Sequence, residues 1–148
     1  MSATLPFTVS GMTVHGKRLG TELGFPTANL EYPAGTELPP DGIYIAQARI
    51  DRRCYAAILN QGNHPTTPEG RATIETHLLD YAGGDLYGKR LTLHYLHYLR
   101  PEIRFATLDA LKAQMGADRE EALRWIGRHR PALLKLLPCG GAEAEPSR

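Results

Sequence analysis

A period-two alternation of side chains runs through the first hundred residues and restricts the chain to a β-rich fold. In residues 43–50, IYIAQARI, alternate side chains fall on opposite faces of an extended strand. Residues 54–60 follow after a short connection, so a hairpin is predicted. Residues 73–81 and 90–99 alternate in the same way and are joined by a turn rich in Gly and Asp. Consecutive short strands joined by turns favour an antiparallel barrel.

The period changes to that of a helix after Pro101. Leu108, Leu111 and Met115 have helical spacing, and Asp118 with Glu121 forms a capping box for a second helix, so two C-terminal helices are predicted. Residues 1–138 are expected to form one domain, and residues 139–148, which have little to bury, a disordered tail.

Charge and length narrow the choice of partners. The 148 residues carry 17 Lys and Arg against 16 Asp and Glu, so no strong basic field attracts nucleic acid or an anionic membrane surface. No apolar run is long enough to span a bilayer, and the first residues lack the pattern of a secretion signal. A cytoplasmic protein is therefore expected.

A glycine-rich segment begins like a phosphate-binding P-loop but departs from it. Residues 11–18, GMTVHGKR, have the two glycines and the lysine, yet Arg18 stands where the loop needs Ser or Thr for magnesium. Residues 19–26 then carry two glycines and a proline where a helix would have to run. The glycines still allow a backbone to approach an anion closely, and Lys17 and Arg18 supply positive charge there.

Two oxygen ligands follow this segment. Thr27 and Asn29 are two residues apart, so in an extended segment both side chains point to the same side. Mg²⁺ bound to nucleotide phosphates needs only one or two oxygen ligands from the protein. The alternative from residue types alone is a turn in which Thr and Asn satisfy backbone groups.

Four stretches in this order resemble the signature of the ATP-dependent riboflavin kinases, or flavokinases. They are VHGKRLGTELGFPTANL (14–30), NQGNHPT (60–66), IETHLLDY with DLYGKRLTL (74–93) and YLRPEIRF (98–105). The resemblance covers about residues 9–130. It implies a mainly β fold, a six-stranded antiparallel Greek-key β-barrel with C-terminal α-helices.

The resemblance also implies an activity and its partners. The family transfers the γ-phosphate of ATP to the 5′-hydroxyl of riboflavin, which gives FMN and ADP, and it uses Mg²⁺ or another divalent ion. Nothing here resembles the adenylyltransferase domain often fused to bacterial members, so FMN is expected as the final product of a monomeric enzyme. A flavin- or FMN-binding sensor or carrier with weak catalysis is the alternative.

The matching positions receive roles by the same resemblance. Thr27 and Asn29 are the implied metal ligands, Glu75 is the catalytic base and contacts flavin, and Arg100 and Phe105 belong to a flap over riboflavin. Thr21 stands where many bacterial members have Arg. The implied nucleotide-binding residues are Gly16, Lys17, Arg18, Gly20, Thr21, Gly24, Thr27 and Asn29.

The position of Glu75 on its strand agrees with that role. It shares a face with Thr73 and His77, and we expect it to point into the mouth of the barrel while Ile74 and Leu78 pack on the other side. The residue type alone favours an exposed surface carboxylate.

Overall fold

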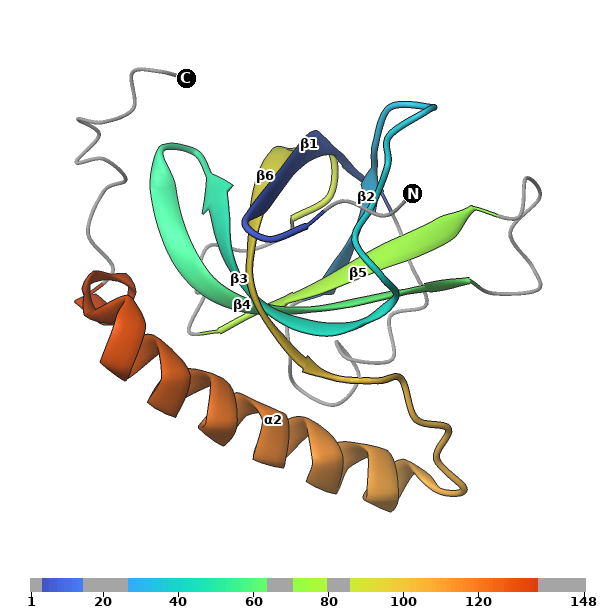
Figure 1. The fold of residues 1–148 in the computed structure, drawn as a ribbon, viewed down its shortest axis with the longest axis vertical. Coiled ribbons are helices and arrows are strands. Elements are labelled where there is room, and N and C mark those ends of the chain that lie inside the picture. The colour runs from blue at the N-terminus through green and yellow to red at the C-terminus, as the bar shows by residue number, and fades with distance from the viewer. Residues whose placement is uncertain (1–3, 15–26, 64–70, 80–85, 136–148) are drawn as a thin grey trace.

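Six antiparallel strands close into a barrel in the computed structural model of the chain, which describes residues 4–14, 27–63, 71–79 and 86–135 (Figure 1). Around the barrel the strands follow the order β1, β2, β5, β4, β3, β6, and β6 pairs with β1. The predicted antiparallel Greek-key barrel is confirmed. The strands are β1 (Phe7–Val14), β2 (Thr27–Glu31), β3 (Gly42–Ile50), β4 (Arg53–Asn63), β5 (Ala72–Leu78) and β6 (Arg90–Arg100).

The hairpin expected from residues 43–60 is present as β3 and β4. Its connecting residues, Asp51 and Arg52, both have positive φ, at 52° and 68°, which matches the right-handed twist of the paired strands. In contrast, β5 and β6 are consecutive among the strands but not adjacent in the barrel. β5 pairs with β2 and β4, whereas β6 pairs with β1 and β3. The alternation in a strand marks its two faces but does not identify its partner.

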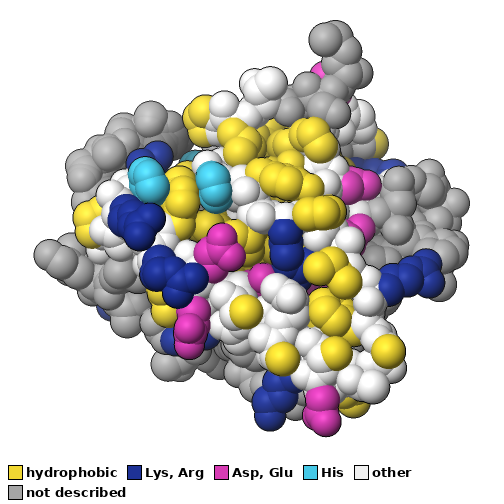
Figure 2. Space-filling view, turned by 60° about the horizontal axis from the view of Figure 1, so that its bottom comes forward, with side chains coloured by type: hydrophobic (Ala, Val, Ile, Leu, Met, Phe, Trp, Pro, Cys, Tyr) yellow, Lys and Arg dark blue, Asp and Glu magenta, His cyan; other side chains and the backbone are white. Residues whose placement is uncertain are grey.

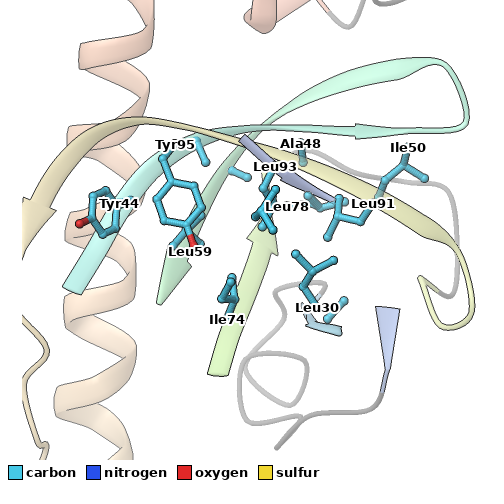
Figure 3. Close-up of a cluster of buried hydrophobic side chains, with 14 of the residues drawn as sticks. Leu30, Tyr44, Ala48, Ile50, Leu59, Ile74, Leu78, Leu91, Leu93 and Tyr95 are labelled. Carbon is cyan, nitrogen blue, oxygen red and sulfur yellow. The ribbon is translucent and has the colours of Figure 1, made fainter. Parts of the chain in front are cut away.

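The barrel interior is a filled hydrophobic core, because six strands leave no room for a channel (Figure 3). Figure 3 shows side chains from β2, β3, β4, β5 and β6 pointing into this common centre. The core also contains polar groups: the buried Tyr95 hydroxyl donates to Gln61 Oε1 at 2.7 Å. The core includes Leu30, Tyr44, Ala46, Ala48, Ile50, Leu59, Ile74, Leu78, Leu91, Leu93 and Tyr95.

The opposite face of β3 and β4 is also apolar, and it is covered by α2 (Leu108–His129). Ala122 and Ile126 of α2 pack against Ile43 and Ile45 of β3 and Ile58 of β4 in a second core outside the barrel. Figure 1 shows α2 lying along the outside of the barrel, and Leu133 of the short 3₁₀ helix η1 (Pro131–Lys135) joins the same cluster.

The prediction of two C-terminal α-helices is wrong, since α2 is one continuous helix of 22 residues. Thr107 caps its start by accepting a hydrogen bond from Ala110 N at 3.0 Å. The expected capping box fails because Asp118 lies inside the helix, where its buried carboxylate binds Arg100 of β6. Gly116 costs about 1 kcal/mol relative to Ala in a helix, which the packing of α2 outweighs.

Figure 2 looks onto the side of the molecule that carries α2. Lys and Arg side chains are mixed there with Asp, Glu and hydrophobic ones, without a broad field of one sign among the described residues in this view. Within the described part of the chain, no helix is long and apolar enough to cross a membrane.

Candidate active site

A row of polar side chains crosses the outer wall of the barrel where β2, β5 and β4 lie side by side. Glu75 of β5 lies opposite Asn29 of β2 on one side and opposite Asn60 of β4 on the other. Two residues further along β5, on the same face, His77 lies opposite Thr27. Because directly opposed residues of antiparallel strands point to the same side, these side chains share one surface. The structure therefore brings Thr27 and Asn29 next to Glu75, which lies far from both in the sequence.

The predicted direction of Glu75 is wrong in one respect. Ile74 and Leu78 do lie on the opposite face, as expected, but they fill the barrel interior. Glu75 consequently points outward from the wall and not into the barrel mouth. Its side chain is half-buried, and its Oε2 atom is buried. A substrate would have to approach this carboxylate from outside the barrel.

Thr27 and His77 form a cross-strand hydrogen bond of 2.9 Å between Oγ1 and Nδ1. Burial lowers the pKa of His77 to about 4, and the nearby Asp118 carboxylate acts in the opposite direction without reversing the shift. The ring is therefore neutral at pH 7. A neutral imidazole beside Thr27 adds no positive charge that would repel a cation there.

Arg100 lies at the end of β6 and is held by α2. Its Nε donates to Asp118 Oδ1 at 3.0 Å, and its Nη2 donates to Asp118 Oδ2 at 2.7 Å. Gln114 Nε2 also donates to Asp118 Oδ1, at 2.9 Å. The Arg100–Asp118 pair therefore fixes the start of the segment 101–107 relative to the helix.

The strand register gives the separation between Arg100 and Glu75. Arg100 pairs with Ile43, Ile43 with Asn60, and Asn60 with Glu75. Three strand spacings of about 4.8 Å, or roughly 14 Å measured along the curved wall, separate the two backbones. Phe105 lies half-buried in the segment between β6 and α2. Arg100 and Phe105 are therefore not in the Glu75 row, and their contacts with flavin stay a prediction.

The remaining predicted nucleotide-binding residues lie outside the described residues, so their role also stays a prediction. These are Gly16, Lys17, Arg18, Gly20, Thr21 and Gly24.

Asn60 is a candidate site residue that the sequence did not single out. Its Oδ1 atom is buried and has no hydrogen-bond partner among the described residues, although it lies beside Glu75. A buried amide oxygen without a partner is costly and often marks a binding position. The stretch NQGNHPT includes Asn60, but only the strand register shows that Asn60 lies next to Glu75.

The donor atoms on β2 fit a divalent cation of the magnesium type. The Thr27 hydroxyl and the Asn29 amide are hard oxygen donors on one face of the strand, and both side chains are half-buried. Mg²⁺ prefers such oxygens and keeps most of its other positions for water and phosphate. The residues present therefore suit the ion that the fold family implies.

The comparisons with known proteins agree with this arrangement. The family model Flavokinase, described as riboflavin kinase, matches residues 3–126. The chain belongs to the riboflavin kinase family. A bifunctional riboflavin kinase/FMN adenylyltransferase of Pseudomonas fluorescens is 42% identical over 114 residues, which are 76% of this chain and 36% of that protein.

Two solved structures have the same barrel. A macrolide-efflux protein from Streptococcus pneumoniae has a TM-score of 0.73 and 34% identity, covering 81% of this chain and 39% of that one. Riboflavin kinase from Trypanosoma brucei has a TM-score of 0.63 and 20% identity, covering 97% and 92% of the two chains, which supports the fold alone. The chain spans only 36–40% of the length of its bifunctional relatives in Pseudomonas fluorescens and Escherichia coli.

Proposed function

We propose that this protein is a riboflavin kinase, which transfers the γ-phosphoryl group of ATP to the 5′-hydroxyl of riboflavin. The observation that carries the proposal is the outer-wall row. Asn29 faces Glu75 and Thr27 faces His77 across β2 and β5, in a member of the riboflavin kinase family. Oxygen ligands for a cation and a carboxylate base are thus neighbours on one surface.

Glu75 is the proposed base. It accepts the proton of the riboflavin 5′-hydroxyl as that oxygen attacks the γ-phosphorus, a new O–P bond forms, and the bond to the bridging oxygen of ADP breaks. The flanking side chains, Asn29 and Asn60, are uncharged amides. They can orient the carboxylate without neutralising it, which keeps its basicity available.

Thr27 and Asn29 are the proposed ligands of a nucleotide-bound Mg²⁺. When bound, the ion neutralises negative charge on the phosphates during transfer. By the family resemblance, the segment 16–24 covers the phosphates, with Lys17 and Arg18 adding charge, while Arg100 and Phe105 belong to the flap over riboflavin. The Arg100–Asp118 pair supports this last role by anchoring the segment 101–107 to α2.

The test is to incubate the purified protein with riboflavin, ATP and Mg²⁺ and to follow FMN by chromatography. We expect FMN and ADP to appear in equal amounts, with no product when ATP or the divalent ion is omitted. Absence of FMN with ATP and with other nucleoside triphosphates would contradict the proposal. Tight FMN binding in such a sample would instead indicate a flavin carrier.

A further inference from the structure

The Thr27–His77 hydrogen bond constrains the hydroxyl that the proposed function assigns to the cation. The two residues are directly opposite each other on β2 and β5, and their Oγ1 and Nδ1 atoms are 2.9 Å apart. A threonine hydroxyl has one proton and two lone pairs, so its value as a cation ligand depends on where the proton points. A proton directed at the cation would repel it.

Two arrangements of this bond are chemically possible. If Nδ1 carries the imidazole proton, it occupies one lone pair of Thr27 and leaves the hydroxyl proton to point elsewhere. If the proton is on Nε2, Nδ1 accepts from Thr27, and the oxygen keeps both lone pairs. The 2.9 Å separation of Oγ1 and Nδ1 suits either arrangement.

We propose that His77 is a positioning residue: Nδ1 accepts the Thr27 proton and thereby turns the lone pairs of Thr27 Oγ1 toward the nucleotide-bound cation. This inference rests on the proposed function, since it needs a cation beside Thr27. His77 itself touches neither the cation nor the substrate in this arrangement. Its effect is to orient a metal ligand, a role for which loss of the orienting group typically weakens metal affinity about 10- to 100-fold.

The barrel contains a matched control for this pair. Thr8 of β1 and His94 of β6 are also opposite each other, and their Oγ1 and Nδ1 atoms are 2.8 Å apart. This second pair bridges β1 and β6, and the row that contains Glu75 does not include it. If cross-strand Thr–His pairs have only a structural role, replacing either histidine should change the cation affinity to a similar extent.

The experiment measures the affinity of the protein–ADP complex for Mn²⁺, a paramagnetic substitute for Mg²⁺, by electron paramagnetic resonance. We expect His77→Leu to weaken this affinity by about tenfold or more. His77→Asn should retain most of it, because its amide oxygen can take the place of Nδ1. His94→Leu should leave it unchanged. Thermal unfolding of each variant checks that the protein measured is folded.

Three outcomes overturn the inference. The first is wild-type affinity in folded His77→Leu. The second is an equal loss in His77→Asn and His77→Leu. The third is a ¹⁵N nuclear magnetic resonance spectrum that assigns the His77 proton to Nδ1 in the wild-type protein. Any one of these three outcomes shows that His77 does not orient Thr27. If the same protein still converts riboflavin to FMN, the proposed function is unaffected. Failure of the wild type to make FMN contradicts the proposed function separately.

Discussion

Asn29 lies directly opposite Glu75 across the β2–β5 pairing, which makes a proposed metal ligand and a proposed base neighbours on the outer wall of the barrel. The two side chains come from strands separated by more than forty residues of sequence. Their proximity depends on the closure of the barrel, because β2 and β5 are not consecutive strands. The first prediction follows from this pair.

Replacing Glu75 with Gln keeps the shape of the side chain and removes its ability to take a proton. We expect kcat for FMN formation to fall by about two to four orders of magnitude, while the dissociation constant for riboflavin changes little. Glu31→Gln is the matched control, since Glu31 is an exposed carboxylate at the end of β2. Unchanged turnover in Glu75→Gln, measured by chromatography, would remove Glu75 from the role of base.

The Arg100–Asp118 pair is predicted to stabilise the attachment of α2 to the barrel. Their side chains are only 18% and 6% exposed, so Asp118→Ala leaves a partly buried guanidinium without its carboxylate. We expect the free energy of unfolding in urea to fall by about 3–5 kcal/mol. The exposed Lys89–Asp51 pair serves as the comparison, and Lys89→Ala should cost about 1 kcal/mol or less. Similar losses in both variants would contradict this ranking.

Gly11 and Gly62 should differ in their tolerance of a methyl group. A Cβ at Gly11 would lie 1.9 Å from the backbone oxygen of Glu31, which the β1–β2 pairing holds in position. A Cβ at Gly62 would meet the Glu102 carboxylate at 2.0 Å, but that is the end of a flexible side chain. We expect Gly11→Ala to lower the free energy of unfolding by about 3 kcal/mol. Gly62→Ala should lower it by about 1 kcal/mol or less, and the reverse order in urea denaturation would contradict the argument.

Stability should decrease at alkaline pH because two buried tyrosines resist ionisation. Burial, more than neighbouring acidic groups, raises the pKa of Tyr95 and of Tyr44 above 10. Above about pH 10 the unfolded chain loses protons that the folded protein keeps, so each such tyrosine reduces stability by about 1.4 kcal/mol per pH unit. Below about pH 10 both the folded and the unfolded chain keep these protons, so the two tyrosines do not lower stability there. Urea unfolding at several pH values should show a shallower decline for Tyr95→Phe than for the wild type, and equal slopes would contradict this cause.

Much of the local structure could be predicted from the sequence. The alternation in residues 43–50 identified the two faces of β3: one lies inside the barrel, and the other is buried beside α2 at Ile43 and Ile45 but only half-buried at Gln47 and Arg49. The spacing of Thr27 and Asn29 identified a shared face, as their register with His77 and Glu75 requires. These features depend only on residues that are close together in the chain, so the sequence predicts them directly.

The relations between distant segments could not be predicted in the same way. Nothing near Asp118 in the sequence indicates Arg100, so a residue that looked like a helix cap was in fact the buried partner of a strand residue. The outward direction of Glu75 depends on which face of β5 lines the barrel interior. The neighbours of β5 and β6 likewise depend on closure, since alternating strands are interchangeable until the barrel forms.

Because the six described strands close on one another, each strand has a paired neighbour on both sides and no whole strand forms a free edge. A partner therefore finds no complete strand edge to extend, although strand addition is a common way for proteins to recruit extended peptides. Whatever associates with these strands has to recognise side chains on the outer wall, on α2 or on the connections between strands. Specificity for partners can thus change by surface substitution without altering the backbone pairing of the barrel.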